Sequence, residues 1–513
     1  MSTPVAPTAA RPIRTFIVIA LSIALVAISA STFDYMLDAM QVDLGFAMDT
    51  GNAVMLIPEI GGLTLVFVAG AMGDHIGRRR IIGAGAAVFA LGALLVTVAP
   101  NIGLVALGRA FEGAGSVVTL IVAVALLAET YVTPRQRALA FGASASIIPA
   151  VFIFAPIAGA WVTQHGSWRL VSALWIGAGT ATAIAARTLL PPDPARTKVE
   201  LLTPLFGGLV LAGIALTCTL VGMGATKPAV ITVAVTAAVG VVLAIAMRLV
   251  ASPGLDLRIP RSPVGALTLL ALMVANAVNL LFFTTLLLQY RYDVGIVMLA
   301  LVMIPVQIAG VAGGFAGGAL MDRIGVVPAA VAMMVMAGAV ALLAVPFGEG
   351  TPIWIAVGMA SLYALFDAAN SGPLTARVMN LAAPDGEGGA SAHREAWSSI
   401  GTAIGGIVAG VLVFGSFHTS LQANLVDRGV PPATAQAISQ QVREGAVTAD
   451  VARTYDVPPK ALTDVEAGDQ PVLTKAQFDA YGTTGVATGI TYGVAAALMG
   501  LSAVVERRRR TRA

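Results

Sequence analysis

The sequence predicts an all-α membrane protein with about 14 transmembrane helices. Its 513 residues are 57% hydrophobic and 11% charged, whereas a soluble globular chain carries about 25% charged residues. The hydrophobic residues form long runs, and a run of about 20 residues is enough to cross a bilayer as a helix. A short polar motif also occurs twice, in the two halves of the chain, which indicates an internal structural repeat.

The apolar runs account for most of the chain. In order, they cover residues 15–36, 54–72, 81–99, 102–127, 138–162, 170–190, 201–224, 230–250, 264–288, 294–321, 326–345, 353–376, 398–417 and 485–505. Polar connections interrupt them at residues 191–198 and 384–395.

Lysine and arginine residues gather in every second short loop and at both ends of the chain. Such residues mark the cytoplasmic face of a membrane protein. The short loops on the opposite side carry only Arg169, Lys227 and Arg291. Both termini are therefore expected in the cytoplasm, which requires an even number of spans.

A long polar segment, residues 418–481, precedes the last span on the outer side. Its sequence predicts helical parts near residues 432–444 and 474–481. We expect it to be either a solvated cap without a role, or a lid or docking surface for an extracytoplasmic partner.

The repeated motif joins the second run to the third and the tenth to the eleventh. It reads G-A-M-G-D-H-I-G-R-R-R at residues 70–80 and G-A-L-M-D-R-I-G at residues 318–325. Gly77 and Gly325 suit a tight connection that needs positive φ or a close backbone approach. The aspartate of each copy ends a helix, where a carboxylate can pair with arginine or meet the N-terminus of a neighbouring helix.

Ionisable groups within spans are costly and are functional hypotheses by default. Asp34 and Asp38 lie one helical turn apart at the end of the first run, and two carboxylates this close in a partly dry cavity favour uptake of a proton near neutral pH. Glu59 follows Pro58 and precedes two glycines, which predicts a bendable helix that carries a carboxylate. Asp367 falls in the middle of the twelfth run. Each could bind a proton or a cation; alternatively, Asp34 and Asp38 lie in water at the interface.

These motifs resemble the signatures of the major facilitator superfamily. The first copy of the repeat is similar to that family's G-x-L-A-D-R-x-G-R-R/K motif, with His75 in place of arginine and Gly73 in place of alanine. Residues 107–115, L-G-R-A-F-E-G-A-G, resemble an antiporter signature tied to proton coupling, although their spacing also permits a local ion pair. Residues 155–160, A-P-I-A-G-A, resemble a second antiporter signature with both flanking glycines changed to alanine. Asp34 fits the position of an aspartate that recurs in the drug:proton antiporter branch with fourteen helices.

The resemblance implies two six-helix bundles related by pseudo-two-fold symmetry, with two additional helices inserted between them. The expected domains are residues 1–190, residues 191–262, and residues 263–513 with the extracytoplasmic loop at about 418–481. Proton and substrate coupling is expected at Asp34, Asp38, Glu59, Arg109, Glu112 and Asp367. The expected cytoplasmic gate comprises Gly70, Asp74, Gly77, Arg78, Asp322, Arg323 and Gly325. A helix-packing motif is expected at Pro156 and Gly159.

The sequence therefore indicates a plasma-membrane transporter that exports amphipathic or hydrophobic, drug-like or cationic compounds in exchange for protons, as in multidrug efflux and antibiotic resistance. A lipid exporter and a non-transporting scaffold or sensor remain open alternatives. The expected partners are a small-molecule or lipid substrate, protons and membrane lipids. We expect no enzymatic activity, cofactor, metal site or nucleic-acid partner, because the sequence has no phosphate-binding loop and no metal-ligand spacing.

Overall fold

The structure is a computed structural model. It describes residues 10–46, 48–193, 198–222, 225–292, 294–348, 350–383, 386–409, 415–427, 429–443, 454–455 and 472–511. Within these ranges the chain forms helices and no strand. Thirteen of the described helical segments are long and apolar enough to cross a membrane. The predicted all-α membrane class is therefore confirmed.

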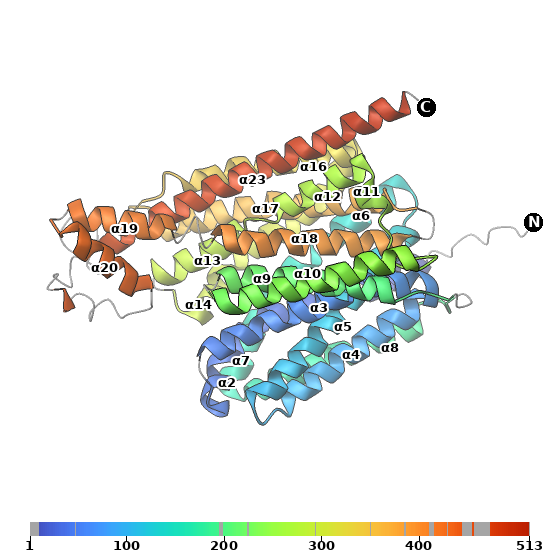
Figure 1. The fold of residues 1–513 in the computed structure, drawn as a ribbon, viewed down its shortest axis with the longest axis horizontal. Coiled ribbons are helices and arrows are strands. Elements are labelled where there is room, and N and C mark those ends of the chain that lie inside the picture. The colour runs from blue at the N-terminus through green and yellow to red at the C-terminus, as the bar shows by residue number, and fades with distance from the viewer. Residues whose placement is uncertain are drawn as a thin grey trace, which may run out of the picture.

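The helices carry the labels of Figure 1. The first half of the chain contains α1 (Ala10–Thr32), α2 (Asp34–Leu44), α3 (Met48–Ile76), α4 (Arg78–Thr97), α5 (Ile102–Thr130), α6 (Pro134–Ala145), α7 (Ile147–His165), α8 (Trp168–Leu189), α9 (Leu202–Gly222) and α10 (Thr226–Leu249). The second half contains α11 (Arg258–Arg261), α12 (Pro263–Ala275), α13 (Leu280–Tyr290), α14 (Ile296–Val302), α15 (Ile304–Ile324), α16 (Val326–Ala341), η1 (Leu342–Ala344), α17 (Ile353–Met379), α18 (Glu387–Ala409), α19 (Gly415–Asp427), α20 (Pro432–Arg443) and α23 (Val472–Arg510).

Four of the predicted single spans each consist of two helices. The breaks fall at Phe33 between α1 and α2, at Ser146 between α6 and α7, at Met303 between α14 and α15, and between α12 and α13. In the last of these, the side chains of Asn276 and Asn279 bond to backbone groups of the flanking helices. The length of each apolar run does not reveal its break, because the run stays apolar overall although single polar residues such as Asp34 and Asn276 lie beside the breaks. Irregular backbone at membrane depth is tolerated where it is buried in protein or lines a cavity.

The start of α18 corrects one prediction. Residues 384–395 are expected from the sequence to form a polar connection, but α18 begins at Glu387 and includes most of them. The carboxylate of Asp74 in α3 accepts hydrogen bonds from two amides in the first turn of α18, and a carboxylate at this position stabilises a helix. The thirteenth predicted span, residues 398–417, therefore starts too late in the chain.

The helices lie side by side in one bundle (Figure 1). Helices α1, α3, α4, α5 and α8 pack together, and α12, α15, α16, α17 and α23 form a second packed set. Two further helices connect the sets: α6 packs on α15 and α17, and α18 packs on α3 and α5. Helix α9 packs on both α3 and α18, and α10 packs on α9 with few of its own side chains buried.

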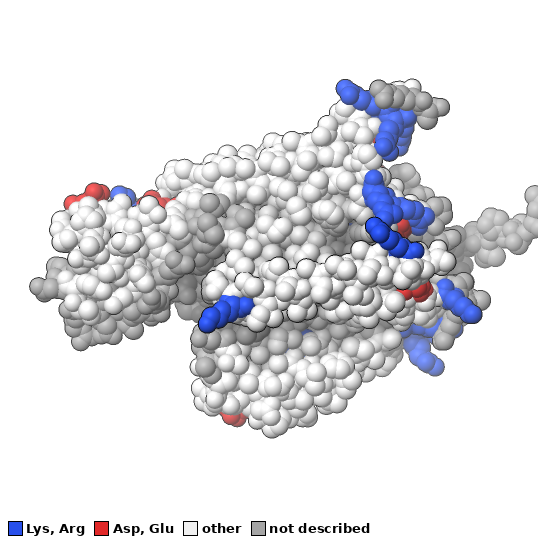
Figure 2. All heavy atoms as spheres, viewed as in Figure 1, with Lys and Arg blue, Asp and Glu red and all other residues white. Residues whose placement is uncertain are grey.

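Basic residues gather at one end of the bundle (Figure 2). We call this the basic end, and it carries the exposed side chains of Arg80, Arg258 and Arg510. The gathering agrees with the uneven distribution of charge in the loops of the sequence.

The opposite end carries a small helical cap, formed by α19, α20 and the start of α23 (Figure 1). This cap has its own hydrophobic core, made of Leu421, Leu425, Ala435, Ile438 and Ala476. The helix predicted near residues 432–444 is confirmed as α20. Much of the rest of the predicted loop 418–481 lies outside the described residues.

Helix α23 connects the cap to the bundle without interruption. It has 39 residues, or about 58 Å at 1.5 Å per residue, whereas the hydrocarbon core of a bilayer is about 30 Å thick. The same helix therefore belongs to the cap at one end and reaches the basic end at the other.

Candidate functional site

A buried ion pair joins Arg109 and Glu112 in the middle of α5. Their side chains are 4% and 0% exposed, and Nη1 of Arg109 lies 2.6 Å from Oε2 of Glu112. Ser29 of α1 donates a hydrogen bond to the same carboxylate oxygen at 3.1 Å, and it also accepts one from Arg109. Nε of Arg109 and Oε1 of Glu112 have no hydrogen-bond partner among the described residues. The local pair that the spacing permits is therefore present, but its hydrogen bonding is incomplete.

Two aromatic rings enclose the guanidinium of Arg109. Its Cζ atom lies 4.2 Å from the ring centroid of Phe33 and 5.7 Å from that of Trp175. Phe33 occupies the break between α1 and α2, and Trp175 belongs to α8. Cation–π contacts contribute about 0.5–2 kcal/mol each. Together with Ser29 of α1, the break at Phe33 and helix α8 therefore hold this arginine. The sequence interpretation missed both rings, because an aromatic residue in an apolar run looks like an ordinary lipid-facing or core residue.

Asp34 and Asp38 follow directly after this break. Both belong to α2, and both side chains are exposed. Asp34 is near enough to Arg109 for the two charges to interact, yet in the described part of the chain no ion pair reaches either aspartate. Both carboxylates therefore stand open to solvent or ligand, and Asp34 does so beside a buried cation.

Glu59 projects from α3 with an exposed side chain, although the residues around it pack tightly. A Cβ atom on Gly113 of α5 would overlap the backbone of Pro58, and one on Gly61 would come within 2.7 Å of the carbonyl oxygen of Ala110. The glycines near Glu59 thus let α3 and α5 approach closely, and α3 stays one continuous helix through Pro58.

Asp367 belongs to a polar network in the second packed set. The hydroxyl of Tyr492 in α23 donates a hydrogen bond to Oδ1 of Asp367 in α17. The ring of Tyr363 packs edge-on against Tyr492, with centroids 6.1 Å apart. Asp367 has no basic partner among the described residues, and a hydrogen bond from tyrosine connects it to a second helix.

At the basic end, Asp74 caps the first turn of α18 from a different helix. Its carboxylate accepts hydrogen bonds from the amides of Gly388 at 2.9 Å and Gly389 at 3.3 Å. The backbones of α3 and α18 come very close here, because a Cβ atom on Gly70 would meet the carbonyl oxygen of Gly388 at 2.5 Å. The expected meeting of this aspartate with a neighbouring helix N-terminus is therefore present.

Arg78 connects three helices around the N-terminus of α18. Its guanidinium lies 3.5 Å from Oδ1 of Asp74 and 3.2 Å from Oε2 of Glu387 in α18, and it also pairs with Glu129 at the end of α5. We call Asp74, Arg78, Glu129 and Glu387, with the first turn of α18, the basic-end gate. The role of Glu129 and Glu387 was missed from the sequence, because neither residue belongs to the repeated motif.

Gly77 allows the sharp turn between α3 and α4. Its φ is 115°, a value that residues with a Cβ atom rarely adopt. A Cβ atom would also overlap the side chain of Asp193, which accepts hydrogen bonds at 2.9 and 3.0 Å from the amides of Arg79 and Arg80. Asp193 caps α4 in this way, and the sequence interpretation did not single it out.

The second copy of the motif shares the turn but not the pairing. Gly325 has a φ of 89°, as expected. Asp322, 33% exposed, lies 3.9 Å from Nε of Arg135 in α6, and that arginine is 81% exposed. Arg323 is exposed and takes part in no ion pair within the described ranges. The two copies therefore contribute unequally to closing the basic end.

Glycine also permits close packing where α6 meets α15. A Cβ atom on Gly142 of α6 would come within 2.7 Å of the carbonyl oxygen of Gly314 in α15. Further along, Pro156 and Gly159 are buried in α7, and a Cβ atom on Gly159 would lie 3.1 Å from Thr32 of α1. α7 thus packs against α1 just before the break that presents Asp34 to its surroundings.

The comparisons with known proteins agree with this architecture. The model of the Major Facilitator Superfamily matches residues 19–406. An uncharacterised MFS-type transporter of Mycobacterium tuberculosis is 31% identical over 157 residues, which cover 30% of this chain and 22% of that protein. The methylenomycin A resistance protein of Bacillus subtilis is 28% identical, covering 29% of this chain and 32% of that protein. A triacylglyceride transporter of Mycolicibacterium hassiacum is 30% identical, with 42% of each chain covered.

The chain spans less than half the length of each of these relatives. Among solved structures, the human organic anion transporter MFSD10 has the same fold, with a TM-score of 0.58 and 13% sequence identity over 96% of this chain and 100% of that chain. The family model covers more than half of the residues. This chain therefore belongs to the Major Facilitator Superfamily, which is a family of transporters and not of enzymes.

Proposed function

We propose that this transporter exports amphipathic or hydrophobic compounds in exchange for protons. Two exposed carboxylates, Asp34 and Glu59, are the main support for this proposal, because no ion pair reaches either of them in the described chain. The charge of Asp34 interacts with that of the buried Arg109, and Glu59 follows Pro58, whose backbone lies against Gly113 next to Glu112. An unpaired carboxylate in such surroundings can bind either a proton or a cationic group of a substrate. Competition between the two ligands couples export to proton entry.

We further propose fourteen spans, because α18 runs parallel to its neighbours in addition to the thirteen apolar segments. Residues 1–190 and 263–513 would then form the two halves that rock against each other, and residues 191–262 would supply the inserted pair α9 and α10. Both termini lie in the cytoplasm of a plasma-membrane protein, and the basic end faces inward.

In this arrangement the conformation described here is closed toward the cytoplasm. The basic-end gate joins α3, α5 and α18, so substrate and protons reach Asp34 and Glu59 from the cap end. Opening the gate would expose the same groups to the cytoplasm, and release of the proton there would prepare the site for the next substrate. Asp367 and its tyrosine partners form the corresponding polar group in the second half.

Purified protein in liposomes tests the proposal. Uptake of a fluorescent amphipathic cation should follow an imposed proton gradient, and Glu59→Gln and Asp34→Asn should each lower the gradient-driven rate at least tenfold. Asp427→Asn, which removes an exposed carboxylate in the cap, serves as the matched control and should leave transport unchanged. Transport that ignores the proton gradient would contradict proton coupling.

A lipid-like substrate is the second candidate, and the cap is the observation that favours it. Helix α23 carries the cap away from the bundle at the end where the site is accessible, and a relative of this chain is a triacylglyceride transporter. Replacing residues 418–471 by a short glycine–serine linker should then abolish export of a fluorescent lipid while the helices still insert. If the export of small cations is lost equally, the cap has no special role in handling lipid. The family membership argues against a non-transporting scaffold or sensor.

A further inference from the structure

Helix α9 of the inserted pair bridges the seam between α3 and α18. Leu63 of α3 clusters with Ala212 of α9, and Ala403 of α18 packs against the same cluster. Gly208 of α9 approaches α3 so closely that a Cβ atom would overlap the carbonyl group of Thr64. α9 is therefore in contact with both sides of the surface that must part if the basic end opens.

Hydrogen bonds join the two ends of the inserted pair at the basic end. Glu200, just before α9, accepts hydrogen bonds from the amide of Thr203 and from the amide of Gly254, both at 2.9 Å. The hydroxyl of Thr203 also accepts one from the amide of Leu255 at 3.2 Å. Burial works against the ionised form of Glu200, but the bonds from Thr203 and Gly254 hold its pKa below the usual value. The start of α9 and the segment after α10 therefore behave as one unit.

His393 of α18 is bonded to this unit. Its side chain is 3% exposed, and its Nε2 forms a hydrogen bond with the backbone carbonyl oxygen of Asp256. A carbonyl oxygen only accepts, so Nε2 carries the hydrogen. Nδ1 has no hydrogen-bond partner in the described chain, and the ring packs edge-on against Phe67 of α3 at a centroid distance of 5.1 Å. One side chain thus touches α18, α3 and the segment that follows α10.

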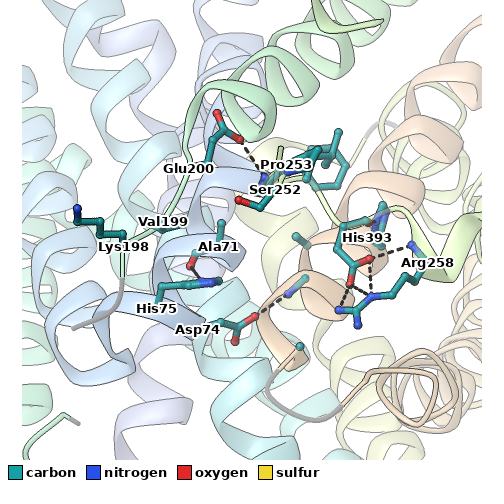
Figure 3. A pocket seen from close by; sticks show the side chains of 17 residues that line it. Ala71, Asp74, His75, Lys198, Val199, Glu200, Ser252, Pro253, Arg258 and His393 are labelled. Atoms are coloured by element: carbon teal, nitrogen blue, oxygen red, sulfur yellow. Dashed lines mark hydrogen bonds and ion pairs between the residues drawn. The ribbon is translucent and has the colours of Figure 1, made fainter. Parts of the chain in front are cut away.

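A cavity of about 220 Å³ lies at this junction. Figure 3 shows that its walls come from α3, from α18 and from the two ends of the inserted pair, with Asp74, Glu200, Arg258 and His393 around it. The carboxylate of Asp256 bonds to the guanidinium of Arg258 within this wall. A space of this size holds water, so water can replace the bond from His393 when the walls separate.

We propose that α9 and α10 are a third leaf of the basic-end gate, and that His393 is the positioning residue that joins this leaf to α18. The inference rests on the proposed function, because it requires α18 to separate from α3 during transport. The close backbone approach at Gly208 keeps α9 of the leaf attached to α3. Among the described residues, the hydrogen bond from His393 to the carbonyl oxygen of Asp256 is what joins the leaf to α18 through polar groups. That bond breaks when the gate opens, and the leaf moves with α3.

Spin-label distances in the full-length protein, reconstituted in lipid nanodiscs, test this assignment. Cys218→Ala provides the background, and pairs of labels go to exposed positions at the basic end: Thr188 in the last turn of α8, Ala251 just after α10 of the leaf, and Asn380 at the end of α17. His393→Phe keeps a ring beside Phe67 but removes the donor. It should raise the ratio of open to closed gate about three- to tenfold, as expected for the loss of one hydrogen bond.

Three further variants control the measurement. His393→Gln retains an N–H donor and should restore most of the wild-type ratio, and His75→Gln changes a histidine of the same cavity wall without touching the bond. Thr203→Val removes the hydroxyl that holds the leaf ends together and should shift the ratio in the same direction as His393→Phe. This variant keeps the test open if His393→Phe does not fold.

The distances separate failure of this inference from failure of the proposed function. In open molecules the distance between labels 188 and 251 should stay constant, while that between labels 251 and 380 should lengthen. If wild-type protein opens its gate but neither His393→Phe nor Thr203→Val changes the ratio, the assignment is overturned and alternating access stands. Equal effects of His393→Phe and His393→Gln would overturn it as well. If the distance between labels 188 and 380 never changes in acidic or alkaline buffer or with substrate, the proposed alternating access itself is wrong.

Discussion

Replacing Asp74 by asparagine should open the basic end of the bundle far more readily than the same replacement of Asp322. The two aspartates occupy the same position in the repeated motif, so the sequence alone predicts similar effects. The structure predicts different effects, because Asp74 caps a helix of the other half whereas Asp322 makes one long, exposed ion pair.

The expected magnitudes follow from the contacts. Asp74 accepts amide hydrogen bonds at 2.9 and 3.3 Å and lies 3.5 Å from Arg78. A hydrogen bond to a charged group contributes about 1.5–3 kcal/mol, and asparagine keeps one acceptor oxygen, so the closed gate loses about 2–3 kcal/mol. At about 1.4 kcal/mol per factor of ten, the open-to-closed ratio rises about 30- to 140-fold. The pair of Asp322 with Arg135 contributes about 0–1 kcal/mol because it is exposed, so Asp322→Asn changes the ratio by less than about fivefold.

Alkylation of a buried cysteine measures this ratio. Ala392 in α18 is 0% exposed and its Cβ atom would lie 3.1 Å from a Cβ atom on Gly70, so a cysteine at position 392 reacts with a water-soluble maleimide only when the seam opens. The background carries Cys218→Ala, and the reference is the position-392 cysteine without other changes. Equal rates for Asp74→Asn and Asp322→Asn would refute the reasoning, since the two copies of the motif would then close the gate equally.

Three further predictions concern stability. Gly77→Ala should lower the free energy of unfolding by about 1–3 kcal/mol because of its positive φ, whereas Gly83→Ala, with open space beside it, should be neutral or slightly stabilising in the same thermal unfolding assay. Tyr492→Phe removes the donor to Asp367 and should cost about 1–3 kcal/mol, seen as a lower midpoint in thermal unfolding; an unchanged midpoint would show that water replaces the hydroxyl. Burial works against ionised Asp256, but hydrogen bonds from the neighbouring guanidinium hold its pKa below 3.8, so its contribution to stability is present above that pH and is lost as the pH falls through its lower folded value. Wild type and Asp256→Asn should therefore differ in stability at neutral pH and converge in strong acid, and a constant difference would contradict this.

The sequence predicts the helices well, because membrane spans are long and apolar and each one leaves a strong local signal. It also predicts the two glycine turns, since φ values such as those of Gly77 and Gly325 are accessible to few other residues. The breaks within spans are not predictable in this way. At Phe33 and Met303 the helix is interrupted within runs that are apolar overall. The polar or proline residues beside these breaks, Asp34 and Pro305, do not mark a break by themselves, because Pro156 lies inside an unbroken helix.

The site was predicted in part. The charged residues stand out in an apolar chain, and Arg109 with Glu112 could be paired from spacing alone. Their partners could not be found, because Ser29 and Trp175 come from helices that are distant in sequence. The same holds for His393, whose bond to the segment after α10 depends on how α9 packs and not on any local pattern.

The uninterrupted length of α23 has a mechanical consequence. Tyr481 near the cap is bonded to Thr284, Tyr492 in the middle to Asp367, and Glu506 near the far end pairs with an arginine of α17. Because α23 is one continuous helix held at three levels, it cannot tilt at one end without straining the contacts at the other two. Binding of a molecule to the cap would therefore shift the hydrogen bond that Tyr492 donates to Asp367 in the middle of the bundle. Binding of a proton or substrate at Asp367 would in turn change the orientation of the cap.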